Sequence, residues 1–327
     1  MELLTASVGS YPKIGDGPEA QRHRQAYSRW ESGEITDEEF ESIQDQVTLE
    51  VIREQVEAGL DVVTDGQIRW YDPVSHIARK LAGCEIDGLL RFFDTNFYFR
   101  QPVVVGRIER RESVLRREFE FAAAASPKPV RAVIMGPYTL ARLSIDRRGA
   151  GTQALVDEFS EVVAAEVRDL VGAGARFIQI DEPAILVHPE DVNILARALE
   201  RVASSSRNAE IAVHLYFEDA GKIYPRLLDL PVDCLSFDFT YGENLLDEIL
   251  DAGCDKNLGL GLIDGRNTRI EEGEKVIEVV RKVVEVFEGR RLYLNPSCGL
   301  EYLPRDVAFR KLQNMVRIAE RIREEIA

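Results

Sequence analysis

Residues 211–219 read IAVHLYFED, an apolar run that carries His214, one of the four histidines in the chain, near its end. A short run of apolar and β-branched residues is typical of a buried strand. Residues 291–300, RLYLNPSCGL, repeat this arrangement with Cys298 just after the apolar part. Both stretches therefore predict strands whose ends carry groups that can do chemistry.

Eight such runs alternate with segments of helical periodicity, which indicates parallel strands joined by helical crossovers. Eight units in 327 residues predict an α/β fold of the (β/α)8 TIM-barrel type, as a single domain over residues 1–327. A doubly wound open sheet is the alternative. The predicted strands are Leu3–Val8, Asp61–Thr64, Arg131–Met135, Phe177–Ile180, Ile211–Leu215, Cys234–Phe239, Leu258–Ile263 and Leu292–Asn295.

The main predicted helix spans Asp37–Ala58, with a capping residue and acidic first turn in TDEEF and a stop at Gly59. Two segments exceed what the barrel needs, one at 10–34 and one near 84–126. The second contains RFFDTNFYFRQPVV, which is too irregular for an outer helix, and we expect it to be inserted near the active face. Further helices are predicted at Val156–Val171, Val192–Val202, Leu245–Leu250, Val276–Phe287 and Val307–Ile322.

Composition and charge exclude several classes of protein. A net charge of −16 argues against a nucleic-acid partner, because phosphates would be repelled. No apolar stretch approaches the roughly 18 residues that span a bilayer, and the N-terminus has no signal-peptide pattern. The four scattered cysteines form no CxxC pair, so we expect free thiols and a cytoplasmic location.

In a parallel barrel the carboxyl ends of the strands form the active face, so polar residues at those ends should converge. His214 and Cys298 provide an imidazole and a thiolate, which suit zinc, and Asp238 is the candidate third ligand of an open catalytic site. Each has an alternative interpretation: a satisfied core histidine, a small buried residue and a turn residue. Cys234 is assigned to the core, since it lies four residues before Asp238 on the same strand.

Asp181 and Glu182 form a carboxylate pair at the end of the fourth predicted strand, in FIQIDEPA. Such a pair suits recognition of a substrate amine or acid–base chemistry. An internal salt bridge is an equally good interpretation.

These strand-end groups resemble the cobalamin-independent methionine synthase family over almost the whole chain. The resemblance is carried by VGSYPKIG (8–15), IQIDEPA (178–184) and NPSCGL (295–300), together with the spacing of His214, Asp238 and Cys298. It implies a zinc-dependent transfer of a methyl group to the thiol of homocysteine, which forms methionine. Asp181, with Glu182 beside it, would bind the substrate ammonium, while Ser10 and the Gly9 backbone would bind its carboxylate.

Family enzymes carry two barrels, whereas this chain has one. The resemblance therefore implies a methylated corrinoid, presented by another protein, as the methyl donor rather than a folate. Gln67 and Asn295, which also lie at predicted strand ends, complete the expected substrate-binding residues.

Three positions depart from the family pattern. Tyr216 stands where the family has a second cysteine ligand, Gln67 where it has a carboxylate, and the neighbourhood of Arg266 where it has a histidine. These departures keep two alternatives open: a noncatalytic partner subunit of a separate methionine synthase, or a methyltransferase for another thiol.

Overall fold

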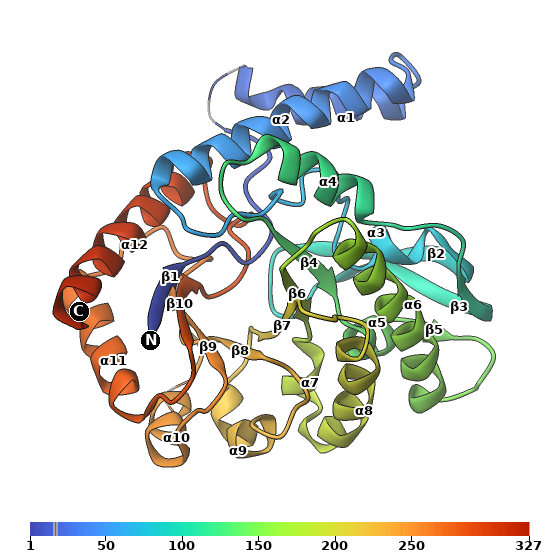
Figure 1. The fold of residues 1–327 in the computed structure, drawn as a ribbon. Helices are drawn as coiled ribbons and strands as arrows, with labels where there is room; N and C mark the ends of the chain where they lie inside the picture. Colours follow the sequence, from blue (N-terminus) through green and yellow to red (C-terminus); the bar gives the residue numbers. More distant parts are fainter. Residues whose placement is uncertain (16, 18, 243, 327) are drawn as a thin grey trace.

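The computed structural model describes residues 1–15, 17, 19–242 and 244–326. Its centre is a curled sheet of seven strands in the order β1-β10-β9-β8-β7-β6-β4, and all neighbours are parallel (Figure 1). The α/β class with helical crossovers is therefore confirmed. The strands are β1 (Glu2–Thr5), β4 (Arg131–Met135), β6 (Phe177–Asp181), β7 (Glu210–Leu215), β8 (Cys234–Asp238), β9 (Asn257–Ile263) and β10 (Arg291–Pro296).

The segment 61–64, predicted as a strand, lies between the two edge strands of this sheet. Val62 forms a parallel bridge with Ala6, just after β1, and Val63 forms one with Val130, just before β4. Backbone hydrogen bonds accompany both bridges, from Ser7 N to Val62 O at 3.1 Å and from Arg131 N to Val63 O at 2.8 Å. The segment therefore contacts both edges through single-residue bridges.

Helices cover the outside of the sheet (Figure 1). The predicted bounds of α2 (Asp37–Ala58) are confirmed at both ends. At the start, Thr36 Oγ1 accepts from Glu39 N at 3.2 Å, and Glu39 Oε2 accepts from Thr36 N at 2.9 Å; at the end, Gly59 adopts φ 94°. Such a capping box satisfies two backbone donors that the first helical turn leaves free. The outer helices are α2 (Asp37–Ala58), α4 (Arg116–Ala125), α6 (Thr152–Gly172), α8 (Val192–Ala203), α10 (Leu245–Ala252), α11 (Gly273–Val286) and α12 (Arg305–Ile326).

The segment 81–125 has more regular secondary structure than the excursion expected near 84–126. It begins with an antiparallel hairpin of β2 (Leu81–Arg91) and β3 (Tyr98–Arg110), and β3 continues the small sheet by pairing with β5 (Ile145–Asp146). It ends with α4, a regular helix beside the sheet. The aromatic stretch that looked irregular thus forms the hairpin tip and the first part of β3, and the hairpin strands lie to the right in Figure 1.

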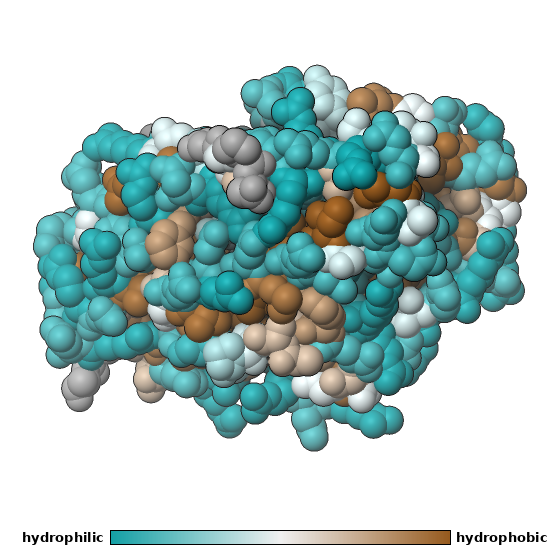
Figure 2. Space-filling model, turned by 90° about the horizontal axis from the view of Figure 1, so that it is seen from above, coloured by the Kyte–Doolittle hydropathy of each residue, from teal (hydrophilic) through white to brown (hydrophobic). Residues whose placement is uncertain are grey.

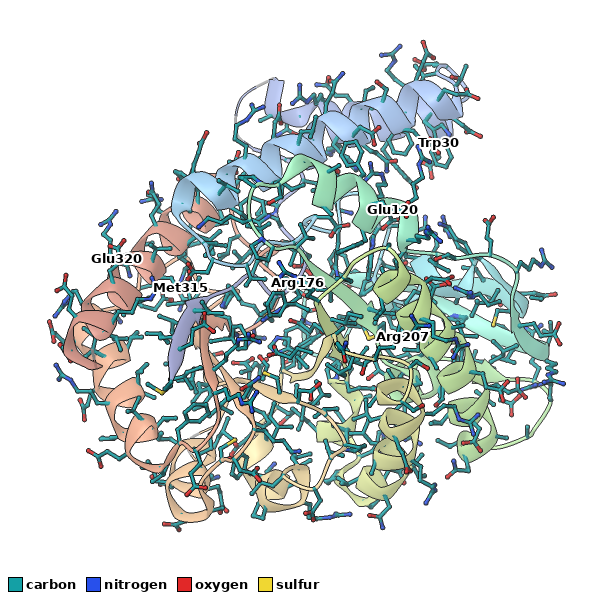
Figure 3. All side chains as sticks on the ribbon, in the orientation of Figure 1. Trp30, Glu120, Arg176, Arg207, Met315 and Glu320 are labelled. Atoms are coloured by element: carbon teal, nitrogen blue, oxygen red, sulfur yellow. The ribbon has the colours of Figure 1, made fainter. Side chains whose placement is uncertain are left out.

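The segment 10–34, the other expected surplus, contains α1 (Arg22–Glu31), which packs along α2. Trp30 of α1 stacks on Phe40 of α2 with ring centroids 5.1 Å apart, and Figure 3 shows Trp30 at the outer rim of the molecule. This unit therefore lies on the outside rather than over the strand ends.

Side chains fill the interior of the curled sheet (Figure 3). A small cluster there includes Cys234, which is 1% exposed, so its assignment to the core is confirmed. The face in Figure 2 is mostly hydrophilic, with apolar residues gathered in patches. Among the helices of the described residues, none is long and apolar enough to cross a membrane.

Candidate active site at the strand ends

Four predicted site residues lie toward the carboxyl ends of parallel strands, at one edge of the sheet. Asp181 ends β6, His214 is the penultimate residue of β7, Asp238 ends β8 and Cys298 follows β10. Each is buried, with exposed fractions of 7%, 0%, 1% and 0% in that order. The strand directions thus place them in one region, as expected from the sequence.

The strand register places His214 deeper than Asp238. His214 pairs with Asp181 on one side and with Ser236 on the other, so Asp238 lies two residues beyond the partner of His214. Two residues of strand correspond to about 6.6 Å. His214 therefore occupies the interior layer below Asp238.

His214 is a neutral imidazole with one free nitrogen. Burial lowers its pKa to about 3, and its Nδ1 lies 3.3 Å from the carbonyl oxygen of Ser236. A carbonyl accepts only, so Nδ1 carries the proton. Nε2 is buried and has no hydrogen-bond partner among the described residues. Its lone pair is available to a ligand.

Tyr216 lies on the same face of its strand as His214 and extends toward Asp181. Its ring centroid is 5.0 Å from that of His214, and its hydroxyl donates to Asp181 Oδ2 at 3.3 Å. Burial raises its pKa well above the usual value, which keeps it a phenol. Tyr216 thus fills space beside His214 without offering an anionic oxygen.

Asp238 is held by hydrogen bonds to both carboxylate oxygens. Thr240 donates to Oδ1 through its backbone N at 2.8 Å and its hydroxyl at 2.6 Å, and Phe217 N donates to Oδ2 at 3.3 Å. Burial raises the pKa of Asp238, and these bonds and the nearby Arg266 oppose that shift. Arg266 lies over the ring of Tyr241, 4.2 Å from its centroid.

Cys298 is a buried thiol. Its Sγ donates to the carbonyl of Gly299 at 3.5 Å, and burial raises its pKa well above the usual value. Gly265 approaches so closely that a Cβ there would lie 2.9 Å from this sulfur. Cys298 is therefore packed between two loops and protonated in this arrangement.

These residues do not form a ready metal site. The described part of the chain contains no group of three or more His, Cys, Asp or Glu residues that could hold a metal ion. The free Nε2 of His214 and the soft sulfur of Cys298 each suit zinc. Asp238 accepts from Thr240 and Phe217 and lies one layer above His214 by strand register, and its oxygens keep lone pairs that a metal could use.

The two carboxyl groups of the pair, Asp181 and Glu182, have different hydrogen-bond partners. Asp181 accepts from Gln179 Nε2 at 2.7 Å and from Tyr216, and burial raises its pKa to about 8. Glu182 accepts from the backbone N atoms of Tyr138 at 2.9 Å and Thr139 at 2.7 Å, at the start of α5 (Pro137–Arg142). Asp181 thus shares the strand-end region with Tyr216, whereas both oxygens of Glu182 are used by α5.

A second polar group lies where β10, β1 and the segment 61–64 end. A Cβ on Gly9 would lie 3.2 Å from Gln67 Nε2, so these two loops touch. Ser10 donates its hydroxyl to Glu301, and Lys13 donates to the carbonyl of Trp70. Sequence analysis did not single out Lys13 and Glu301, although Glu301 stands only three residues after Cys298.

Asn295 faces the interior rather than the strand ends. Its Nδ2 donates to Pro296 O at 2.8 Å, and its Oδ1 is buried without a partner among the described residues. A Cβ on Gly259 would lie 3.0 Å from this oxygen and even closer to Ser236 Oγ, which also lacks a described partner. The Asn295 side chain therefore approaches Ser236, although its backbone pairs with Gly261 at the level of Asp238.

Aromatic residues of the hairpin tip cover the strand ends, and we call this group the aromatic cover. Phe217, which follows Tyr216, packs against hairpin rings with centroid distances of 5.9–6.1 Å, and Tyr302, which follows Glu301, packs likewise on Phe97. This packing explains the burial of the site below. The cover comprises Phe92, Phe93, Phe97, Phe99, Phe217 and Tyr302.

The chain is similar to known proteins over almost its whole length. A family model described as "Cobalamin-independent synthase, Catalytic domain" matches residues 3–321. A methionine synthase of Saccharolobus solfataricus is 32% identical over 326 residues, covering 99% of this chain and 96% of its own. One of Sulfurisphaera tokodaii is 34% identical over 327 residues, covering 99% of this chain and 94% of its own. A solved B12-independent methionine synthase from Shewanella sp. W3-18-1, in complex with selenomethionine, has a TM-score of 0.82 and 25% identity over 100% of this chain and 99% of its own.

Proposed function

We propose, since this chain belongs to the cobalamin-independent methionine synthase family, that it transfers a methyl group to the thiol of homocysteine and forms methionine. One observation carries the proposal: the family match spans residues 3–321, and the sheet within it brings Asp181, His214 and Cys298 to one region. The solved neighbour with selenomethionine supports an amino-acid ligand at this kind of site.

The reaction needs a thiolate. A free thiol has a pKa of about 8.5, so most of it is protonated at neutral pH. In the transfer, the sulfur forms a bond to the methyl carbon, and the bond between that carbon and its donor breaks with its electron pair going to the donor. We assign the substrate ammonium to Asp181, its carboxylate to the loop of Gly9 and Ser10, and a neutral hydrogen bond to Gln67.

The proposal includes zinc held by His214, Asp238 and Cys298, since a bound zinc ion would supply a deprotonated substrate thiol. The free Nε2 of His214 and the buried sulfur of Cys298 support it.

Metal analysis of the purified protein tests these ligands. We expect about one zinc per chain in the wild type, as for an open catalytic site with three protein ligands. His214→Ala and Cys298→Ser should each lose it, because each removes a donor. Stoichiometric zinc retained in both variants would show that these residues are not the ligands.

The methyl donor is proposed to be a methylated corrinoid presented by another protein in the cytoplasm. The support is the length of the matched relatives, of which this chain covers 94–96%. Methionine formation should be measured side by side with methylcobalamin and methyl-folate. We expect faster turnover with methylcobalamin, and the opposite order would reject this donor.

A noncatalytic role beside a separate methionine synthase is the second candidate. Tyr216 favours it, because a phenol bound to Asp181 occupies the place beside His214 where the family has a thiolate. A chain with this role need neither bind zinc nor form methionine, so the two assays above separate the candidates.

We further propose that the whole chain, residues 1–327, is one eight-stranded (β/α)8 barrel with the β2–β3 hairpin inserted. The bridges of Val62 and Val63 to both sheet edges support closure by the segment 61–64.

A further inference from the structure

Glu301 accepts a hydrogen bond from the Ser10 hydroxyl, the group that was expected to bind the substrate carboxylate. Ser10 Oγ donates to Glu301 Oε2, and the two loops are joined by a backbone bond from Leu300 N to Ser10 O at 2.9 Å. A Cβ at Gly299 would collide with both side chains, so only glycine permits this approach. The Ser10 hydroxyl is thus already committed to a carboxylate of the protein itself.

The surroundings of Glu301 favour a cation. Asp181 ends β6 and Glu301 follows β10, and Lys13 lies close enough to Glu301 for that carboxylate to oppose the lowering of the Lys13 pKa by burial. Gln179 Nε2 donates to Val8 O at 2.8 Å and to Asp181 Oδ1 at 2.7 Å, so Asp181 lies beside the loop whose Ser10 contacts Glu301. Glu301 also contributes to raising the pKa of Asp181, after the larger effect of burial. Glu301 is itself only partly covered, so a ligand can reach it.

Gln67 is neutral where the family has a carboxylate, so this region has one negative charge fewer than the family pattern. Gln67 touches the Gly9 loop but is neutral, so of the two residues expected to bind the substrate ammonium, Gln67 and Asp181, only Asp181 carries a carboxyl group. We propose that Glu301 acts together with Asp181 to bind the ammonium group of the amino-acid substrate, and that it supplies the charge that Gln67 lacks. This inference rests on the proposed function, since it takes an α-amino thiol as the substrate.

The physical basis is the strength of charge-assisted hydrogen bonds. An ammonium between two carboxylates donates to both, and such bonds are shorter and roughly twice as strong as neutral ones. Lys13 is a cation near Glu301, and it can meet the substrate carboxylate together with the Gly9 backbone, because the Ser10 hydroxyl is committed. The site should therefore select ligands by their amine first and by their carboxylate second.

Calorimetric titration with three product-like probes tests this order in the purified full-length protein. The probes are methionine, 3-(methylthio)propylamine, which lacks the carboxylate, and 4-(methylthio)butanoate, which lacks the amine. We expect wild-type protein to bind the first two more tightly than the third. Glu301→Gln should weaken both amine-bearing probes by about tenfold to a hundredfold, the range expected for losing one bond between charged groups, and should leave the butanoate unchanged or tighter.

Two further variants complete the design. Glu288→Gln is the matched control, because Glu288 is exposed and precedes β10, at the opposite end of the strand that Glu301 follows. It should bind all probes like wild type. Ser10→Ala should weaken the amines less than Glu301→Gln, since it removes only the bond that orients Glu301, and a thermal melt verifies that each variant is folded.

The outcomes separate this inference from the function itself. Equal weakening of all three probes in Glu301→Gln, or no weakening at all, would overturn the role of Glu301. If the wild type binds the probes in the expected order but forms no methionine with either donor, the ammonium site stands and the proposed reaction fails.

Discussion

Tyr216 is the residue that lies beside His214, a candidate metal ligand. It lies in the layer of Asp238 and next to His214, and its hydroxyl is bound to Asp181. The sequence alone indicated that a side chain two positions after His214 faces the same side of the strand, and the structure confirms this. It could not indicate that the phenol would bind Asp181, because that contact joins residues 35 positions apart.

At this scale we predict that Tyr216→Cys tightens zinc binding. The change replaces a phenol that stays protonated with a soft ligand that zinc prefers, in the layer where Asp238 lies. Competition with a zinc chelator measures the difference from wild type.

Tyr216→Phe is the matched control, since it removes the bond to Asp181 without adding a ligand, and it should retain zinc like wild type. Unchanged or weaker zinc retention in Tyr216→Cys would place position 216 away from the metal and favour the noncatalytic role.

Elements differ in how far their own sequence determines them. The bounds of α2 were predicted because Thr36, Glu39 and Gly59 act within a few residues of the helix ends. The β2–β3 hairpin was missed because its tip interrupts the alternation of a strand: Phe93 adopts a positive φ of 49°, and the Thr95 hydroxyl bonds back to Phe92 O at 2.5 Å. Its cover over the strand ends depends on contacts with Phe217 and Tyr302, more than 100 residues away.

The element-scale prediction concerns this aromatic cover. Phe97→Ala removes a ring that packs on Tyr302, 6.1 Å between centroids, and should open a path to the strand ends. We expect alkylation of the Cys298 thiol, followed by peptide mass spectrometry, to become faster by about twofold to tenfold, since loss of one aromatic pair costs about 0.5–1.5 kcal/mol.

Phe309→Ala provides the control, because Phe309 is a half-buried phenylalanine of α12, outside the cover. Its effect on the alkylation rate should be small. If both variants label Cys298 at the same rate, the hairpin tip does not control access to the site.

For the whole molecule, the strand order was largely predictable and the bridging of both sheet edges by the segment 61–64 was not. Seven of the eight predicted runs are strands of one parallel sheet, because each buries a run of apolar residues on both faces. The segment 61–64 pairs by single bridges with residues near positions 6 and 130, and such long-range pairing leaves no local signal. Asp61, Thr5 and Arg323 form a hydrogen-bonded group there, which we call the polar lock. Asp61 Oδ2 accepts from Thr5 N and Thr5 Oγ1, both at 2.8 Å, and from Arg323 of α12.

We predict that the polar lock holds the segment 61–64 against the edges of the sheet. Arg323 also donates to Leu3 O at 3.0 Å, so Asp61 joins the first strand, the closing segment and the final helix. Asp61→Asn keeps the size of the side chain but removes its charge and half of its accepting capacity, and should lower the free energy of unfolding by about 1–3 kcal/mol. Asp251→Asn, at an exposed position of α10, should change it by less than about 0.5 kcal/mol. Hydrogen exchange should show faster exchange at the amides of Val62, Val63 and Ser7 in Asp61→Asn before it changes in β7 and β8, because only the former lie at the closure. A uniform change across the sheet, or an effect no larger than that of Asp251→Asn, would mean that the bridges of Val62 and Val63 close the sheet without this carboxylate.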